Sequence, residues 1–194
     1  MYLNEALYQD FLSTKEILWL GIDFSKAKVT KSGFNVSQEE LRNCITYWNT
    51  LIISDQKKYD IRLSFRKPVM SYDLTRTNKI NKNIRINNML KENITMEDVY
   101  TDEYIVKYIR ETETSTLHRF GLSFIIESLD SLSKTGSIWV VINETLTKEP
   151  VLCEKFLKVP SGFGLKSYWS RIFYDLLYDV RVYAFHRWEN LIKH

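Results

Sequence analysis

The sequence predicts an α+β fold: an antiparallel sheet of about five strands, packed by a central helix and a long C-terminal helix. Three strand-like runs follow one another at 122–129, 137–143 and 151–159. Their short connections favour an antiparallel meander, because parallel neighbours need a crossover of a dozen or more residues. A complete helix-start signal in the first quarter and a helical apolar pattern at the C-terminus supply the two helices.

The N-terminal part is expected to hold a helix followed by two strands. Residues 2–13 have the apolar spacing of a short helix, with Leu3, Leu7, Phe11 and Leu12 on one side. The apolar run 17–24 is bounded by polar residues, which is typical of a buried strand. Residues 27–34 alternate more weakly, and we expect them to pair with that strand as a hairpin.

The central helix has the clearest start in the chain. Ser37-Gln38-Glu39-Glu40 forms a capping box, in which the serine hydroxyl and the Glu40 carboxylate each satisfy a free amide. Val36 and Leu41 fit the flanking hydrophobic staple. The helix is predicted to continue to about Lys57 and to bury a stripe made of Leu41, Cys44, Ile45, Trp48, Leu51 and Ile52.

We expect one domain, 1–194, with an irregular insertion at about 60–117. Within the insertion, 69–74 is expected to be an edge strand that begins after Pro68. Repeated asparagines after it argue against a helix, because the asparagine amide competes for backbone hydrogen bonds. A further helix is expected to start near Thr101 and to pack through Ile105, Tyr108 and Ile109.

The C-terminal helix is predicted to span 166–192. Its buried stripe is expected to comprise Trp169, Ile172, Phe173, Leu176, Val180, Tyr183, Ala184 and Leu191. Tyr174, Tyr178 and Trp188 lie beside this stripe. They indicate either a broad buried face or a surface for a protein partner or a second copy of the chain.

Composition bounds the class of protein. The chain has 194 residues, 44% of them hydrophobic, and a net charge of +3 with a pI of about 8.7. That apolar content excludes intrinsic disorder, and the two cysteines do not make a disulfide scaffold. The N-terminus lacks the pattern of a signal peptide, and no apolar run is long enough to span a bilayer. With Met1 as the native start, we expect a cytoplasmic protein.

Charge is distributed unevenly along the chain. Between Arg62 and Lys91, eight Lys and Arg residues face a single acid, Asp73, and the next stretch is acidic. The two stretches either face each other, lie on solvated surface, or leave the basic one free to contact phosphates. The asparagine-rich part of this basic stretch has few aromatic residues for stacking bases, so we do not expect nucleic acid to be the partner.

A glycine loop before the last helix is the best candidate for a ligand site. Backbone amides at a helix start attract anions, and Ser161, Gly162, Gly164, Lys166 and Ser167 surround such a start. The spacing is not that of a phosphate-binding loop. The alternative is a turn that needs a positive φ.

Asp23 follows an apolar strand, as do the aspartates that hold metal or phosphate in some α/β enzymes. Such sites need further carboxylates, and Glu127 and Glu144 are the candidates near strand ends. No spacing links the three, and the histidines have no metal-ligand spacing. We therefore predict no catalytic residues, no metal site and no cofactor, and a turn aspartate is the simpler interpretation of Asp23.

Three motifs carry a resemblance to a known family: Trp19-Leu20-Gly21-Ile22-Asp23-Phe24-Ser25, Gly121-Leu122-Ser123-Phe124-Ile125-Ile126-Glu127-Ser128 and Gly162-Phe163-Gly164-Leu165-Lys166-Ser167-Tyr168-Trp169. They resemble motifs of an uncharacterised bacterial family, mainly from the Bacteroidetes. The resemblance spans most of the chain and implies no activity. The predicted order of elements also matches profilin-like and longin-like domains, an analogy of fold alone.

These observations favour a non-catalytic binding or protein-interaction domain rather than an enzyme, because the polar residues assemble no reaction centre. The alternative is a protein that binds a small anion or a nucleotide-type ligand, or an enzyme, with its site at 161–167 and Asp23. The third hypothesis is nucleic-acid binding through residues 62–91.

Overall fold

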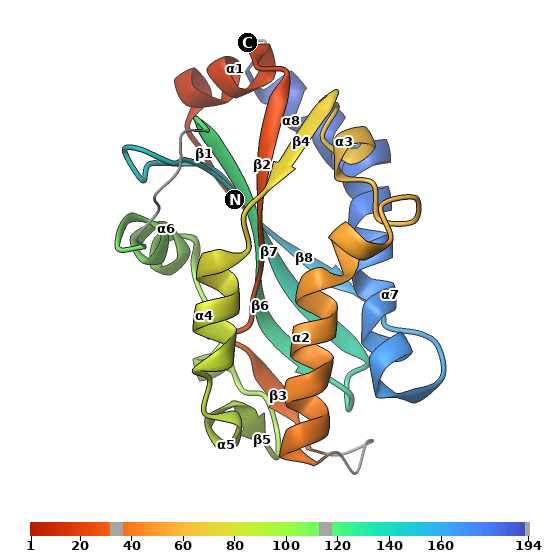
Figure 1. The fold of residues 1–194 in the computed structure, drawn as a ribbon. Helices are drawn as coiled ribbons and strands as arrows, with labels where there is room; N and C mark the ends of the chain where they lie inside the picture. The colour runs from red at the N-terminus through yellow and green to blue at the C-terminus, as the bar shows by residue number, and fades with distance from the viewer. Residues whose placement is uncertain (32–36, 113–117, 193–194) are drawn as a thin grey trace.

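One sheet of eight strands organises the computed structural model, which describes residues 1–31, 37–112 and 118–192. The main path of the sheet runs in the order β1-β8-β7-β6-β2-β4, and β3 joins it by pairing with β5 and β6 (Figure 1). The strands are β1 Tyr2–Leu3, β2 Glu16–Asp23, β3 Lys28–Thr30, β4 Val69–Tyr72, β5 Leu90–Lys91, β6 Phe120–Asp130, β7 Thr135–Glu144 and β8 Pro150–Lys158.

The α+β class and the antiparallel meander of β6, β7 and β8 are confirmed. The sheet as a whole is mixed rather than antiparallel, because β2 pairs in parallel with both β4 and β6. Helices lie in both connections that lead from β2 to β4 and from β4 to β6. Connections of that length allow parallel neighbours, and the short turns of the meander do not.

The expected hairpin between the second and third strands is wrong. Strands β2 and β3 both run parallel to β6, β2 beside residues 121–125 and β3 beside residues 128–129. The two strands therefore pair one after the other with the same edge of β6. The chain between them leaves the sheet at Phe24, which is fully buried, and does not reverse direction.

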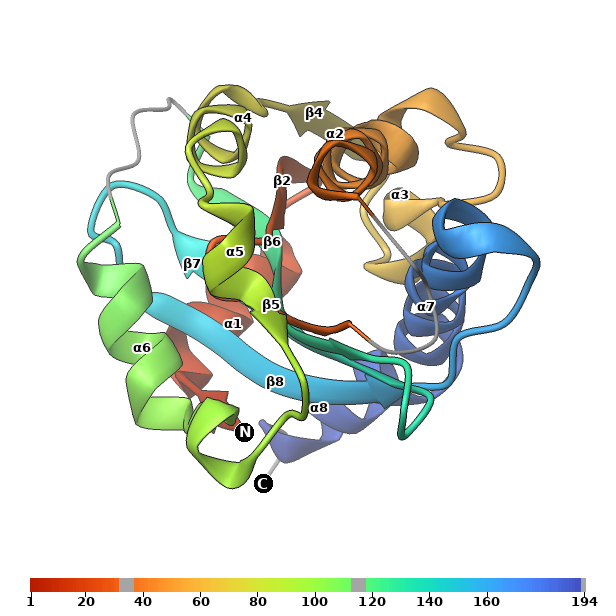
Figure 2. The ribbon, with the colours of Figure 1, turned by 90° about the horizontal axis from the view of Figure 1, so that it is seen from below.

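Helices cover both faces of the sheet (Figures 1 and 2). Helices α1, α2, α7 and α8 belong to the large core that contains alternate residues of β6 and β7. The opposite face carries α6, which packs on Ile125, Trp139, Val141 and Cys153. The helical elements are α1 Glu5–Ser13, α2 Gln38–Ser54, α3 Ile61–Ser64, α4 Thr75–Lys82, α5 Ile86–Met89, the 3₁₀ turn η1 Met96–Asp98, α6 Asp102–Arg110, α7 Gly164–Asp179, the π turn η2 Val180–Ala184 and α8 Phe185–Leu191.

The predicted start of α2 is confirmed. The Glu40 amide donates to the Ser37 hydroxyl at 3.1 Å, as the capping signal requires. The helix ends at Ser54 rather than near Lys57. Trp48 is fully buried and its indole N–H donates to the carbonyl of Lys166 at 3.0 Å. Val36, the other half of the expected staple, lies outside the described residues.

The C-terminal helix is continuous through α7, η2 and α8, but its buried stripe changes face. The π turn η2 adds an extra residue to one turn and so rotates everything after it. Tyr183 is 65% exposed and Leu191 is 44% exposed, so both were wrongly assigned to the core. Trp188 is fully buried beside Phe65, Phe156 and Phe185 instead.

Residues 60–112 contain more regular structure than the sequence suggested. Strand β4 is an edge strand and α6 begins after Thr101, both as expected. Helix α4 forms in spite of its asparagines, because Asn81 bonds to the sheet. Its amide nitrogen donates to the carbonyl of Ile22 at 2.8 Å, and its amide oxygen accepts from the N–H of Phe24 at 3.0 Å.

Two further side chains complete this contact with the edge of β2. Asn49 accepts from the N–H of Ile22 at 2.7 Å, and the Thr77 hydroxyl donates to the carbonyl of Leu20 at 2.9 Å. We call Asn49, Thr77 and Asn81 the edge clamp. Strand β4 pairs only as far as Trp19. Beyond that residue, the edge clamp supplies the hydrogen bonds that a neighbouring strand would otherwise give.

Lys67 is a buried cation that closes the end of α1. Its Nζ donates a hydrogen bond to the carbonyl of Phe11 and another, at 2.8 Å, to the carbonyl of Thr14. The residue as a whole is 2% exposed. Carbonyls at a helix C-terminus have no partner within the helix and attract a positive charge. Burial lowers the pKa of Lys67 from 10.5 to about 8.

This lysine should make stability depend on pH in a known direction. Between pH 8 and pH 10.5, Lys67 is protonated in the unfolded chain and largely deprotonated in the folded chain. Because the unfolded state binds more protons in this range, the free energy of unfolding increases as pH rises. Relative to Lys67→Met, the wild type should gain about 2 kcal/mol between pH ~7.5 and ~9.5. Urea unfolding of both proteins across this range measures the gain. Cys and Tyr residues titrate in the same pH range in both proteins, so their effect on stability cancels in the comparison. If the free energy of unfolding of the two proteins changed in parallel with pH, the lowered pKa of Lys67 would be contradicted.

Candidate functional site

A large hollow lies between α4 and α5 on one side and α6 and the β2–β3 connection on the other. Its volume is about 1380 Å³. We call it the basic cleft. It is lined by Leu20, Ser25, Lys26, Ala27, Lys28, Asp73, Thr75, Arg76, Lys79, Ile80, Asn83, Ile84, Arg85, Asn88, Met89, Tyr108, Glu111, Thr112 and Lys148.

Helix α4 has two polar faces, and this determines which side chains reach the cleft. Thr77 and Asn81 are buried and fix one face of the helix to β2. Arg76, Lys79 and Asn83 occupy the neighbouring positions and line the cleft. The edge clamp therefore positions the wall that carries the cations.

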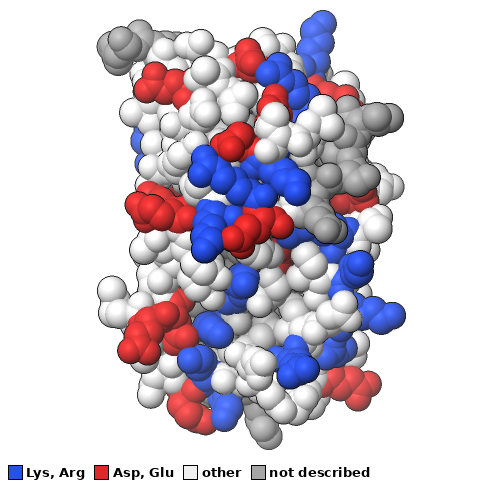
Figure 3. Space-filling model, turned by 90° about the vertical axis from the view of Figure 1, so that its left-hand side faces the viewer, with Lys and Arg blue, Asp and Glu red and all other residues white. Residues whose placement is uncertain are grey.

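Positive charge dominates the basic cleft. Six of its lining residues are Lys or Arg and two, Asp73 and Glu111, are acidic. Among the described residues, Lys79, Arg85 and Lys148 have no ion-pair partner. Figure 3 looks onto this side of the molecule, and Lys and Arg dominate its lower half while acids lie mainly toward the margins. An array of unpaired cations in a hollow raises the local concentration of anions.

Asp23 lies beside this cleft, and both of its carboxylate oxygens accept hydrogen bonds from neighbouring residues. Its Oδ2 accepts from the Tyr108 hydroxyl at 2.6 Å, and its Oδ1 accepts from the N–H of Ser25 at 2.8 Å. Arg76 stands 3.8 Å from the same Oδ2, and Asp23 is 1% exposed. Burial and the Asp23 charge raise the pKa of Tyr108 to about 12. Asp23 therefore joins β2 to α6 and leaves no free carboxylate oxygen facing the cleft.

The cleft also has an apolar floor. We give this name to its apolar lining residues, which are Leu20, Ala27, Ile80, Ile84 and Met89. Ala27, Ile84 and Met89 are buried, and Leu20 and Ile80 are partly exposed. A ligand that fills the cleft thus meets apolar surface below and cations around it.

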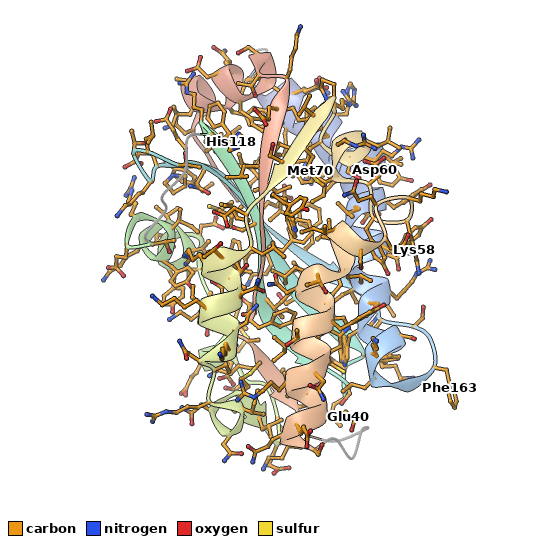
Figure 4. All side chains as sticks on the ribbon, viewed as in Figure 1. Glu40, Lys58, Asp60, Met70, His118 and Phe163 are labelled. Atoms are coloured by element: carbon orange, nitrogen blue, oxygen red, sulfur yellow. The ribbon has the colours of Figure 1, made fainter. Side chains whose placement is uncertain are left out.

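The glycine loop at the start of α7 and strand β2, which ends at Asp23, lie on opposite sides of α2 (Figures 1 and 2). Phe163 is 97% exposed and points away from the sheet (Figure 4). Gly162 and Gly164 have φ of 125° and 74°, which fits the alternative of a turn that needs glycine. The Lys166 Nζ lies 3.6 Å from the ring centre of Tyr47.

A shallow hollow of about 370 Å³ adjoins this loop, and Lys166 shares it with Glu39 and Glu40. Ser161 and Ser167 are exposed and do not line it. Two carboxylates beside one lysine make the hollow a poorer place for an anion than the basic cleft.

The other candidate carboxylates and the described histidines do not line the basic cleft. Glu127 accepts from Tyr100, Ser137, Trp139 and Lys155, so it is a buried and satisfied anchor. Glu144 binds Arg119 and Thr147 at the surface. His118 lies 3.3 Å from Glu16, and His194 is outside the described residues. In the described ranges, no group of three His, Cys, Asp or Glu residues could hold a metal ion.

The sequence identified only part of the basic cleft. Of the eight cations between Arg62 and Lys91, Arg76, Lys79 and Arg85 reach it. Lys91 instead pairs with Asp98 at 3.0 Å, which is the one ion pair between the basic and the acidic stretch in the described chain. Sequence reasoning missed Lys26, Lys28 and Lys148, because only the folded topology brings them to this place.

No protein-family model matches the chain, and no curated protein matches it. Both results agree with a resemblance to an uncharacterised family. Among solved structures, the C-terminal domain of LpoB from Salmonella enterica aligns with 79% of this chain and 93% of that chain, at 10% identity and a TM-score of 0.27. A similarity that slight carries no functional argument. Within the described residues, no helix is both long and apolar enough to cross a membrane.

Proposed function

We propose that this chain is a non-catalytic binding protein that holds an anionic partner in the basic cleft. The observation that carries the proposal is the convergence of Lys79, Arg85 and Lys148, none of which has an ion-pair partner among the described residues. Cations gathered in a hollow repel one another, and an anion between them relieves that repulsion.

The surroundings of the cations favour binding over catalysis. Asp23, the buried acid beside the cleft, accepts a hydrogen bond at 2.6 Å from Tyr108, the phenol that lines it. A general base must reach a substrate proton, and the Asp23 carboxylate is 1% exposed and already accepts from Tyr108 and Ser25. We therefore expect recognition by charge and shape rather than a reaction.

Three sequence-based candidates remain as weaker proposals. The loop of Gly162 and Lys166 is a possible second anion site, although Glu39 and Glu40 lie beside it. Tyr178, which is 51% exposed, offers a place on the C-terminal helix for a protein partner or a second copy. Nucleic acid is the third, and it would use the same basic cleft.

Binding of inorganic tripolyphosphate tests the main proposal. We expect it to raise the melting temperature with concentration, because a ligand that binds only the native state stabilises it. The effect should weaken as salt increases. In Lys79→Glu/Arg85→Glu, the apparent affinity should fall at least ~10-fold, which corresponds to the loss of two charge contacts.

The control is Lys57→Glu/Arg181→Glu, which makes the same change in net charge at two exposed positions outside the cleft. It should bind tripolyphosphate like the wild type. Equal losses in both double variants would mean that net charge, and not the cleft, attracts the anion, and the proposal would be wrong.

A further inference from the structure

We infer that the partner of the basic cleft is an acidic, amphipathic protein segment, in which carboxylates contact the walls and apolar side chains contact the floor. This inference rests on the proposed function and specifies the ligand class. It depends on three properties of the cleft: its size, its apolar floor and its lack of free aromatic rings.

The size of the cleft argues against a small ion as the natural ligand. Its volume of about 1380 Å³ exceeds the ~300–1,000 Å³ that is usual for small-molecule pockets. The cations stand on separate elements: Lys79 on α4, Arg85 at the start of α5, and Lys148 on the turn between β7 and β8. Cations on three separate elements around a hollow of this volume suit a chain with several spaced anionic groups better than one compact ion.

The floor argues for a ligand that also has apolar groups. Leu20 and Ile80 line the cleft and are partly exposed, and Ala27, Ile84 and Met89 also line it but are buried. Covering such surface removes it from water and contributes about 25 cal/mol per Å². A purely ionic chain leaves this contribution unused, and leucine or valine side chains between acidic ones would gain it.

The aromatic residues argue for a peptide over a nucleic acid. Proteins that bind single strands usually stack bases on exposed aromatic rings. Tyr108 is the one aromatic residue among those that line the cleft, and its hydroxyl is bonded to Asp23. The Lys26 ammonium already lies 5.1 Å from the centre of its ring. The cleft thus offers charges and an apolar floor, but no free ring for a base.

Three labelled probes of equal charge test the inference with the wild-type protein. The first is a peptide of alternating glutamate and leucine, the second has serine for leucine, and the third is an oligothymidylate. Fluorescence anisotropy at ~0.15 M salt gives the affinities, because weaker surface attraction is screened there. We expect the leucine peptide to bind at least ~10-fold more tightly than either of the others.

Two variants locate the contacts. Ile80→Gln should weaken binding of the leucine peptide about fivefold or more and should weaken binding of the serine peptide less, because the change removes apolar surface and no charge. Lys79→Glu/Arg85→Glu should weaken both ligands. Lys57→Glu/Arg181→Glu should change neither.

The outcomes separate the inference from the function on which it rests. If the serine peptide or the oligothymidylate binds as tightly as the leucine peptide, the inference is overturned while anion binding stands. If tripolyphosphate binds and none of the peptides does, the inference is likewise overturned and anion binding stands. If none of the probes and no tripolyphosphate binds, the proposed function itself fails.

Discussion

Gly21→Ala should destabilise the protein by about 3–5 kcal/mol, more than an ordinary substitution on a strand. Gly21 has a φ of 96°, a conformation that costs a residue with a side chain about 1–3 kcal/mol. A β-carbon there would also collide with the Thr77 hydroxyl and would stand 2.7 Å from the amide oxygen of Asn49. Both atoms belong to the edge clamp, so the methyl group must displace a buried hydrogen-bond network. Urea unfolding measures the loss.

Gly164→Ala is the matched control. Gly164 also has a positive φ, 74°, but nothing lies within 4 Å of the position of its β-carbon. This variant should therefore carry the strain alone and lose about 1 kcal/mol. Equal losses at the two positions would show that the clash with the edge clamp is unimportant.

The elements that local signals specify could be predicted from the sequence. The Ser37 cap, the meander of β6 to β8 and the start of α6 after Thr101 each depend on residues close together in the chain. The parallel pairing of β2 could not be predicted in this way. Its partners, β4 and β6, follow it after long helical connections, and no short-range pattern specifies them.

Helix α4 shows why the basic cleft was only partly found. A helix that packs against a sheet normally has an apolar stripe, but the buried positions of α4 include Thr77 and Asn81. Their partners are backbone atoms of β2, more than fifty residues earlier. Asn81, one of the asparagines that argued against a helix, is thus one of the residues that attach it to β2. Without that attachment in view, the cations of this segment had no predicted location.

The edge clamp connects the fold to the candidate site, and Asn81→Leu tests the connection. Leucine can neither donate to the carbonyl of Ile22 nor accept from the N–H of Phe24, so two buried backbone groups lose their partners. Each such loss costs about 1–3 kcal/mol, and we expect about 3–4 kcal/mol in all. Hydrogen exchange should show faster exchange of the Phe24 amide. Asn87→Leu, at an exposed position of α5, should change stability by no more than about 0.5 kcal/mol.

The same variant should affect the basic cleft. Asn81 lies between Lys79 and Asn83, which line the cleft, so loss of its bonds frees the wall that carries these residues. Under conditions where Asn81→Leu is still folded, tripolyphosphate should bind it more weakly, although no residue in contact with the anion has changed. Unaltered affinity together with the expected loss of stability would mean that α4 keeps its place without the edge clamp. The cleft would then depend on the packing of α2 against α4 rather than on the amides.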